Sequence, residues 1–316
     1  MENKIKILFL ILMLSALSPQ IYCQNTSPST EGKEFWVTFM KNGKRACTAV
    51  PNDNDKLQLT IIAREVTTAT ISNPTTGYTN TVVVPAMTRT LLEVPYSQFY
   101  TDEYGTIMNT GMLITAEKNI CVYASNQAEN SFDATLVLPI RCLGKDYSIT
   151  TVGTRYYIDD CGDVYAAQFA IVATTDNTRI KITSKLDTNT GQFKDLPFEV
   201  TLNRGQVYMI GAEHPPSSSQ FPEYTIGLSG SWVEVVQGGQ VAVFQGNSAT
   251  YEKERLNNPN YNLLASHTYD QAIPIKYCGK QASAIMVNNS STEYYLTAIG
   301  FMIIHILPML MGILTI

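Results

Sequence analysis

The chain has 316 residues, of which 45% are hydrophobic and 16% charged, with a formal net charge of −5. This length and composition can bury one large core or two ordinary ones, which excludes a disordered chain. Lys and Arg are scattered singly, without the basic stripe that a phosphate backbone requires, so we expect no nucleic-acid partner. The chain has three histidines, His214, His267 and His305. This scarcity argues against a histidine-based catalytic centre or metal cluster, and we expect no cofactor.

Residues 1–23 have the pattern of a secretory signal peptide. Two lysines precede the apolar run Ile7–Leu17, and Ser18-Pro19 interrupts this run before Cys23. We expect a helical signal segment that is cleaved after Cys23 and followed by a linker over residues 24–33. The mature protein is therefore predicted to be exported to the cell surface, the outer membrane or the extracellular space.

Between the two ends of the chain, the pattern predicts an all-β fold. Apolar and polar residues alternate in segments such as Arg179–Thr183 and Phe198–Leu202, as they do in half-buried strands. Turn residues separate the segments, for example Asn189-Thr190-Gly191 and Asn203-Arg204-Gly205. Short strands with frequent turns indicate antiparallel β-sandwiches.

An internal repeat sets the predicted number of units. Four pairs of segments recur in the same order: Leu59–Ala63 with Phe169–Ala173, Thr88–Val94 with Arg204–Ile210, Ile120–Asn126 with Val241–Asn247, and the joint Leu138–Lys145 with Ile273–Lys280. We therefore expect two tandem β-sandwich units, each of ordinary domain size. The predicted organisation is unit 1 over 34–140, unit 2 over 141–265, and a joint with the start of an incomplete third unit over 266–295.

Residues 296–316 form an apolar tail without Lys, Arg, Asp or Glu, long enough to span a bilayer as a helix. Three interpretations stay open. The tail is a transmembrane anchor, a removable segment for a glycolipid anchor, or the artificial end of a truncated or frame-shifted gene. The third interpretation is favoured by the position of the tail, because it begins just after the expected first strand of a third unit, near 294–298.

The order of several motifs resembles the N-terminal domain of the IgG Fc-binding protein family. This family occurs in mucus-associated animal proteins and in secreted or surface proteins of Bacteroidetes, and this chain is most similar to the bacterial type. The motifs that carry the resemblance are Glu31–Met40, Ser131–Ala134, Val137–Pro139, Leu143–Tyr147, Ile171–Thr178, Asn203–Tyr208 and Ala242–Asn247. The resemblance implies a secreted binding module. Binding of antibody Fc itself would be a transfer by name alone.

The residues offer no catalytic or metal constellation. The acidic group at 159–163 lacks the spacing of a twelve-residue calcium loop. Ser131 and Asp133 have no histidine in a comparable sequence context, which argues against a hydrolytic triad. We expect Asp133 and Asn126 to be loop and strand-end residues that hydrogen-bond to backbone. Trp36 and Trp232 lie in strand patterns and are expected in sandwich cores.

Five cysteines remain after removal of Cys23, and in an exported protein this number predicts disulfides and one odd thiol. The repeat suggests two pairs, Cys142 with Cys161 and Cys47 with Cys121. Cys278 would then be the odd thiol. Reduced, buried cysteines are the alternative.

We therefore expect a non-catalytic surface module for binding or adhesion, with an extracellular protein or glycan such as a mucin-like glycoprotein as its partner. No ligand-binding residue can be named from the sequence. A structural spacer in a larger surface protein is the alternative, and a carbohydrate-active enzyme with paired carboxylates is the third possibility. The membrane is a further partner only through the tail.

Overall fold

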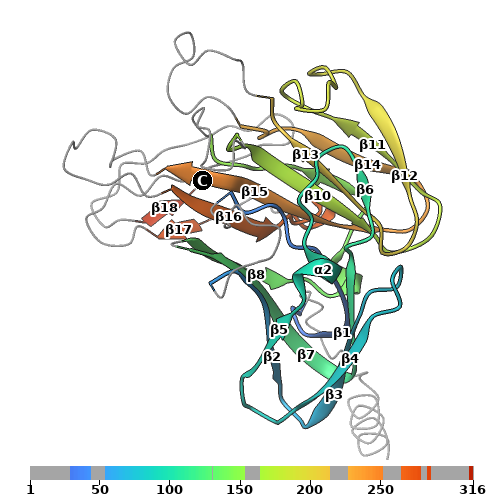
Figure 1. Cartoon of the computed structure of the whole chain (residues 1–316), viewed down its shortest axis with the longest axis vertical. Coiled ribbons are helices and arrows are strands. Elements are labelled where there is room, and N and C mark those ends of the chain that lie inside the picture. Colours follow the sequence, from blue (N-terminus) through green and yellow to red (C-terminus); the bar gives the residue numbers. More distant parts are fainter. Residues whose placement is uncertain are drawn as a thin grey trace, which may run out of the picture.

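The structure is a computed structural model that describes residues 29–43, 54–129, 131–153, 164–213, 227–251, 265–278, 283–285 and 313–315. The predicted signal peptide, Cys47, Cys161, the acidic group at 159–163 and the expected third-unit strand at 294–298 lie outside these residues. The regular structure of the described chain is mostly antiparallel β-sheet, which confirms the predicted fold class (Figure 1).

Unit 1 is built on one seven-stranded sheet. Its strands are β1 (Gly32–Val37), β2 (Lys56–Ala63), β3 (Thr67–Ser72), β4 (Thr79–Val84), β5 (Thr90–Val94), β7 (Met112–Ala128) and β8 (Ser131–Val137). The long strand β7 serves two layers. Its first part pairs with β1 and β3, and its second part pairs with β2 and β8. A single helical turn, α2 (Tyr96–Phe99), follows β5.

Unit 2 consists of two sheets. The first, which we call the middle sheet, has the order β16-β15-β10-β13-β6. Its strands are β16 (Ala265–Gln271), β15 (Val241–Tyr251), β10 (Ala167–Ala173), β13 (Val207–Gly211) and β6 (Ile107–Met108). The outer sheet has the order β12-β11-β14-β9, with strands β12 (Phe198–Leu202), β11 (Thr178–Thr183), β14 (Trp232–Gln237) and β9 (Asp146–Ser148). Strand β6 comes from the unit 1 part of the sequence, so the middle sheet contains residues from both units.

The pairing of the strands confirms the internal repeat. The layer β4-β3-β7-β1 matches β12-β11-β14-β9, and the layer β5-β2-β7-β8 matches β13-β10-β15-β16. Leu59 pairs with Ala124, and its counterpart Phe169 pairs with Gln245, as the sequence correspondence requires. Strands β5 and β13 also correspond, but two residues out of the register that the sequence repeat predicts. Thr60 of β2 faces Leu91 of β5, whereas Ala170, the counterpart of Thr60, faces Met209 of β13.

The two joints adopt the same local structure. A 3-10 helix follows a proline in each, η1 (Ile140–Cys142) after Pro139 and η4 (Ile275–Tyr277) after Pro274. A glycine packs on each proline, because a Cβ added to Gly32 would lie 2.4 Å from Cβ of Pro139, and one added to Gly144 would lie 2.5 Å from Cβ of Pro274. The sequence prediction of a repeated joint is therefore confirmed.

Burial distinguishes the middle sheet from the sheet of unit 1. Strand β2 buries alternate residues, whereas every residue of β10 is buried. One face of β10, with Phe169 and Ile171, packs in a core shared with the outer sheet. Its other face, with Ala170 and Val172, belongs to the core of unit 1. A strand buried on both faces has a continuous apolar run, as β10 has over Phe169–Ala173. The two units therefore share a continuous hydrophobic core.

Near the end of the chain, β17 (Ser283–Ile285) pairs with β18 (Ile313–Thr315), so the described part of the apolar tail is a strand. Within the residues that the structure describes, there is no helix with the length and apolar character needed to cross a membrane.

Candidate functional site

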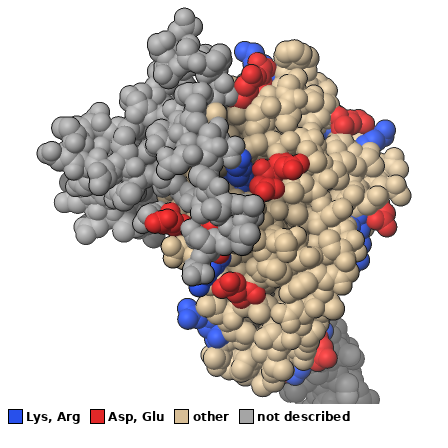
Figure 2. Space-filling model, in the orientation of Figure 1, with Lys and Arg blue, Asp and Glu red and all other residues tan. Residues whose placement is uncertain are grey.

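Charge on the visible surface is sparse and mixed. In the view of Figure 2, basic and acidic side chains are interspersed and separated by wide uncharged areas. Several are paired across strands, for example Lys181 with Glu234 and Arg179 with Glu199. Exposed pairs of this kind contribute little to stability.

The structure brings His267 next to Ser131 and Asp133, although the sequence gave no sign of this proximity. The contacts do not form a triad. Ser131 Oγ accepts the backbone N–H of His267 at 2.9 Å, and Asp133 Oδ2 accepts the backbone N–H of Tyr269 at 2.7 Å. The imidazole faces the other way, with Nδ1 at 2.8 Å from the carbonyl oxygen of Asn247. The prediction that Asp133 and Asn126 bond to backbone is confirmed, because Asn126 Nδ2 donates to the carbonyl oxygen of Met40 at 2.8 Å.

These contacts belong to a ladder between β8 and β16. Ser131, Asp133 and Thr135 accept the backbone N–H groups of His267, Tyr269 and Gln271, respectively. Strand β16 is the end strand of the middle sheet, and its outward N–H groups would otherwise lack partners. Side-chain oxygens thus take the place of a paired strand and attach unit 1 to the edge of unit 2.

Burial shifts the pKa values of the groups around this ladder. Desolvation lowers the pKa of His267 to about 4. Hydrogen bonds to the backbone of Asn247 and Ser248 act in the opposite direction and raise this pKa. Desolvation also raises the pKa of Asp133, and the N–H groups of Tyr269 and Ala134 oppose this increase. A neutral, fully enclosed imidazole is a structural group here, since no solvent or substrate reaches it.

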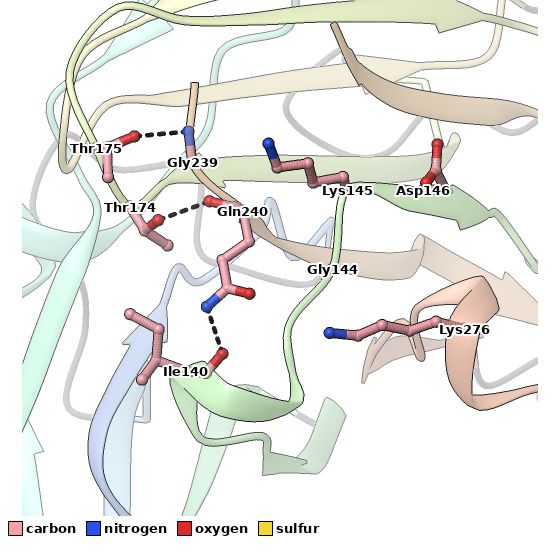
Figure 3. Close-up of a pocket in the computed structure, with 9 residues that line it drawn as sticks. All are labelled: Ile140, Gly144, Lys145, Asp146, Thr174, Thr175, Gly239, Gln240 and Lys276. Carbon is pink, nitrogen blue, oxygen red and sulfur yellow. Dashed lines mark hydrogen bonds between the residues drawn. The ribbon is translucent and has the colours of Figure 1, made fainter. Parts of the chain in front are cut away.

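A surface pocket of about 520 Å³ lies beside the first joint, and we call it the joint pocket (Figure 3). Four segments of the chain line it: the first joint with the start of β9, the turn after β10, the turn after β14, and η4. Each of the two turns leads from one sheet of unit 2 to the other. The lining residues are Ile140, Gly144, Lys145, Asp146, Thr174, Thr175, Gly239, Gln240 and Lys276.

Hydrogen bonds among the lining residues fix the walls of the joint pocket. Thr174 Oγ1 donates to the carbonyl oxygen of Gln240 at 2.6 Å, and Thr175 Oγ1 accepts the N–H of Gly239 at 2.9 Å. The side-chain amide of Gln240 donates to the carbonyl oxygen of Ile140 at 2.6 Å. The pocket is therefore held by contacts that join the turns after β10 and β14 to each other and to the joint.

Two ammonium groups give the joint pocket a positive character. Both lysine side chains extend toward the side formed by Gly239 and Gln240, whereas Asp146 points away (Figure 3). Lys145 Nζ donates to the carbonyl oxygen of Gly238 at 2.8 Å, and Lys276 Nζ lies 4.8 Å from the ring centre of Tyr277. An ammonium group over an aromatic ring still has donors available, so this arrangement suits a carboxylate or sulfate group on a ligand.

A second surface feature is the loop between β11 and β12, residues 184–197. The corresponding turn of unit 1 occupies only residues 73–78, so the loop is an insertion relative to the repeat. Its exposed side chains include Phe193 at 66% and Leu196 at 60% of full exposure. Insertions on a repeated scaffold commonly carry contacts with partners.

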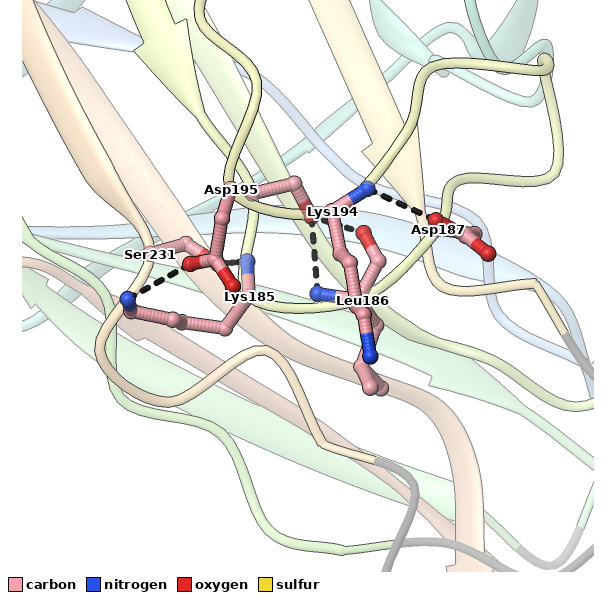
Figure 4. A network of polar contacts seen from close by, with 7 residues as sticks. Lys185, Leu186, Asp187, Lys194, Asp195 and Ser231 are labelled. Carbon is pink, nitrogen blue, oxygen red and sulfur yellow. Dashed lines mark hydrogen bonds and ion pairs between the residues drawn. The ribbon is translucent and has the colours of Figure 1, made fainter.

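Polar contacts fix the shape of this loop (Figure 4). Lys185 Nζ pairs with Asp195 Oδ1 at 2.7 Å, and this bond lowers the pKa of the Asp195 carboxyl. Asp187 Oδ1 accepts the backbone N–H of Lys194 at 2.6 Å, and Ser231 Oγ accepts that of Lys185 at 3.0 Å. The loop therefore presents its apolar side chains from a defined backbone.

The predictions for the cysteines and tryptophans have different outcomes. The described cysteines are Cys121, Cys142 and Cys278, and no disulfide joins any two of them. Because the proposed partners Cys47 and Cys161 lie outside the described residues, the two proposed disulfides stay predictions. Trp36 is fully buried, as expected, and the guanidinium of Arg204 lies 5.2 Å from its ring centre. Trp232 is only partly buried, since it alternates with the buried Val233 on β14, so its core assignment was wrong.

A sequence model of the family described as IgGFc binding protein matches residues 133–300, more than half of the chain. The chain belongs to the IgG Fc-binding protein family. The matched segment begins in β8 and includes all of unit 2, the joint pocket and the inserted loop. This is a binding family rather than an enzyme family. A comparison with curated proteins finds no match.

Proposed function

We propose that this protein is a non-catalytic, exported binding module of the cell surface that contacts an extracellular glycoprotein or mucin-like partner. Membership of the IgG Fc-binding protein family supports a binding role with an extracellular protein. The observation that carries the choice of partner is the joint pocket, where the ammonium groups of Lys145 and Lys276 extend toward the same wall.

The chemistry of the joint pocket favours acidic groups on glycans. Mucin-type chains end in carboxylates and sulfates, which accept charge-assisted hydrogen bonds from lysine. The threonine hydroxyls and backbone groups of the turns after β10 and β14 add neutral polar contacts of the kind that sugars use. The inserted loop, with Phe193 and Leu196 exposed, lies in the same unit and supplies an apolar surface for the protein part of a partner.

The test is binding of the mature protein to immobilised mucin glycoproteins, before and after enzymatic removal of sialic acid and sulfate. We expect removal of these groups to weaken binding at least tenfold. The substitution Lys276→Gln should weaken binding by about tenfold, since a charge-assisted hydrogen bond contributes roughly 1.5–3 kcal/mol. Purified IgG Fc, tested in parallel, decides whether the property named for the family extends to this chain.

Lys118→Gln is the matched control. Lys118 is an exposed lysine of unit 1 that pairs with Glu65 and lies outside the joint pocket. Its substitution should leave binding unchanged. Equal binding by the wild-type protein and the Lys276→Gln variant would remove the joint pocket from the proposal.

A structural spacer is the second candidate, because the continuous core across the two units makes them one stiff body. Failure of the folded, exported protein to bind any of the glycoproteins or Fc would favour the spacer.

A further inference from the structure

The two units differ at the corner where the chain passes from one sheet layer to the other. In unit 1, β7 runs through this corner as one continuous strand, with residues 117–119 between its two halves. In unit 2, β14 and β15 are separate strands, and residues 236–240 take the place of 117–119. The unit 2 segment is therefore longer, and it contains Gly239, which lines the joint pocket.

The neighbouring turn is also longer in unit 2. The turn after β2 comprises residues 64–66, whereas its counterpart after β10 comprises residues 174–177. The two lengthened segments touch, because the Gly239 N–H donates to Thr175 Oγ1 at 2.9 Å and a Cβ added to Gly239 would lie 2.5 Å from the same oxygen. Such a close approach requires glycine. The joint pocket is thus lined by two insertions relative to unit 1.

Two ion pairs occupy the equivalent corner of unit 1. Arg64 Nε lies 2.7 Å from Glu31 Oε1, and Lys118 Nζ pairs with Glu65 Oε2. A hydrogen bond from Lys118 and its positive charge lower the pKa of the Glu65 carboxyl, so this group is charged at neutral pH. In unit 1, the protein itself therefore supplies carboxylates at the corner.

The repeat shows which of these charges unit 2 retains. Gly32 and Gly144 are equivalent, because they pair with the equivalent residues Ile120 and Val241 and each packs on the proline of a joint. The residues beside these glycines, those after β2 and β10, and those of the two joints correspond in order. The corresponding pairs are Glu31 with Leu143, Lys33 with Lys145, Arg64 with Thr174, Glu65 with Thr175, and Arg141 with Lys276.

Unit 2 has lost the carboxylates of this corner but has kept two cations. Neutral side chains replace Glu31 and Glu65, whereas Lys145 and Lys276 keep the positive charges of the joint positions. The acidic residue in the lining, Asp146, points away from the pocket (Figure 3). Within the residues that the structure describes, neither ammonium group pairs with a carboxylate. A carboxylate of a ligand can supply the missing partner.

We propose that the joint pocket binds one carboxylate group of the ligand in the place that the Glu65 carboxylate takes in unit 1, and that Thr175 determines this specificity. Thr175 is exposed and its side chain is short, so a ligand group can reach the wall toward which both lysines extend. The assignment rests on the proposed function and narrows it from acidic groups to carboxylates. The equivalent corner of unit 1 has its own carboxylates, so we expect one bound group per chain.

Thr175→Glu tests the position, because it restores the carboxylate of unit 1 inside the joint pocket. We expect this variant to bind mucin glycoproteins more weakly by about tenfold or more, since its carboxylate competes with that of the ligand. Thr175→Gln introduces a side chain of the same size without the charge and should change binding by less than about threefold. Glu65→Gln, the loss of the charge at the equivalent position of unit 1, should leave binding unchanged.

Titration of the mature protein, followed by NMR, tests the chemical group with three probes: sialyllactose, sulfated lactose and an amidated peptide with a single glutamate. We expect a carboxylate probe to shift the amide signals of Thr175 and Gly239 and to saturate at one equivalent per chain. A response to sialyllactose alone assigns the carboxylate to a glycan, and a response to the peptide alone assigns it to a protein. A response to sulfated lactose that equals or exceeds those of both carboxylate probes would overturn the proposal, as would no response to any probe.

The outcomes separate this proposal from the proposed function. Failure of the wild-type protein to bind mucin glycoproteins would contradict the proposed function. Mucin binding that is the same in Thr175→Glu and Thr175→Gln would contradict the carboxylate assignment alone. Circular dichroism and the thermal midpoint establish that each variant is folded.

Discussion

At the scale of single residues, His267 has the most unusual environment in the described chain. It is 1% exposed and lies between the two units, with Asn126 Nδ2 3.4 Å from Nε2 and the Asn247 carbonyl next to Nδ1. Both ring nitrogens therefore have polar neighbours that suit the neutral imidazole. A proton added to Nε2 would face the amide donor of Asn126 in a buried site.

This environment predicts a dependence of stability on pH. The folded pKa of His267 is about 4, below the unfolded value of 6.5. Between these values the unfolded chain binds more protons, so the free energy of unfolding should fall as the pH decreases from 6.5 to 4, by at most about 3 kcal/mol. The raised pKa of Asp133 acts in the opposite direction, because it favours the protonated folded state.

Urea unfolding at several pH values measures this effect, with His267→Gln as the comparison. In the His267→Gln variant, the free energy of unfolding should fall much less between pH 6.5 and 4 than in the wild-type protein, whatever its value at neutral pH. Identical pH profiles for the two proteins would contradict the assignment.

At the scale of elements, side-chain oxygens rather than a backbone ladder join β8 to β16. Thr135 is the clearest example, because its hydroxyl accepts the Gln271 N–H at 2.9 Å and donates to Asp270 Oδ1 at 2.8 Å. Removal of this oxygen leaves a buried N–H group without its acceptor. An unsatisfied donor of this kind typically costs more than the hydrogen bond itself contributes.

Thr135→Val should therefore lower the free energy of unfolding by about 1–3 kcal/mol. The matched control is Thr81→Val, where the hydroxyl lies on an exposed strand surface beside Thr70 and a change within about 0.5 kcal/mol is expected. Chemical denaturation of both variants provides the comparison. Equal losses would show that the ladder adds nothing beyond ordinary strand contacts.

At the scale of the whole molecule, the shared core links the stability of the two units. One face of the middle sheet is turned away from the outer sheet and carries Val207, Met209 and Phe244. These residues are in one apolar cluster with residues of unit 1 such as Leu59 and Ile114. If the units separated, both would expose large apolar surfaces to water. The units should therefore unfold together.

Calorimetry of the mature chain tests this coupling. We expect a single transition whose calorimetric and van't Hoff enthalpies agree. Met209→Asp, which buries a charge between the units, should lower the midpoint of that one transition by many degrees rather than split it. Two resolved transitions in the wild-type protein would show that the units are independent.

Local patterns in the sequence determined a large part of this structure. Alternating residues and turn residues specify strands and hairpins, because the two-residue period of a strand is fixed by its backbone. The repeat was visible because equivalent strands keep similar residues, such as Leu59–Ala63 and Phe169–Ala173, and the Pro-Ile joints carry their own 3-10 turns.

Only the tertiary structure decided which surfaces meet. His267 is distant in the sequence from Ser131, the joint pocket combines four separate segments, and β6 crosses from unit 1 into the middle sheet. The apolar run Phe169–Ala173 of β10 indicates burial on both faces, but it does not show which part of the chain covers the second face. Contacts between distant segments depend on how whole sheets stack, and no pattern within a short stretch of sequence encodes that arrangement.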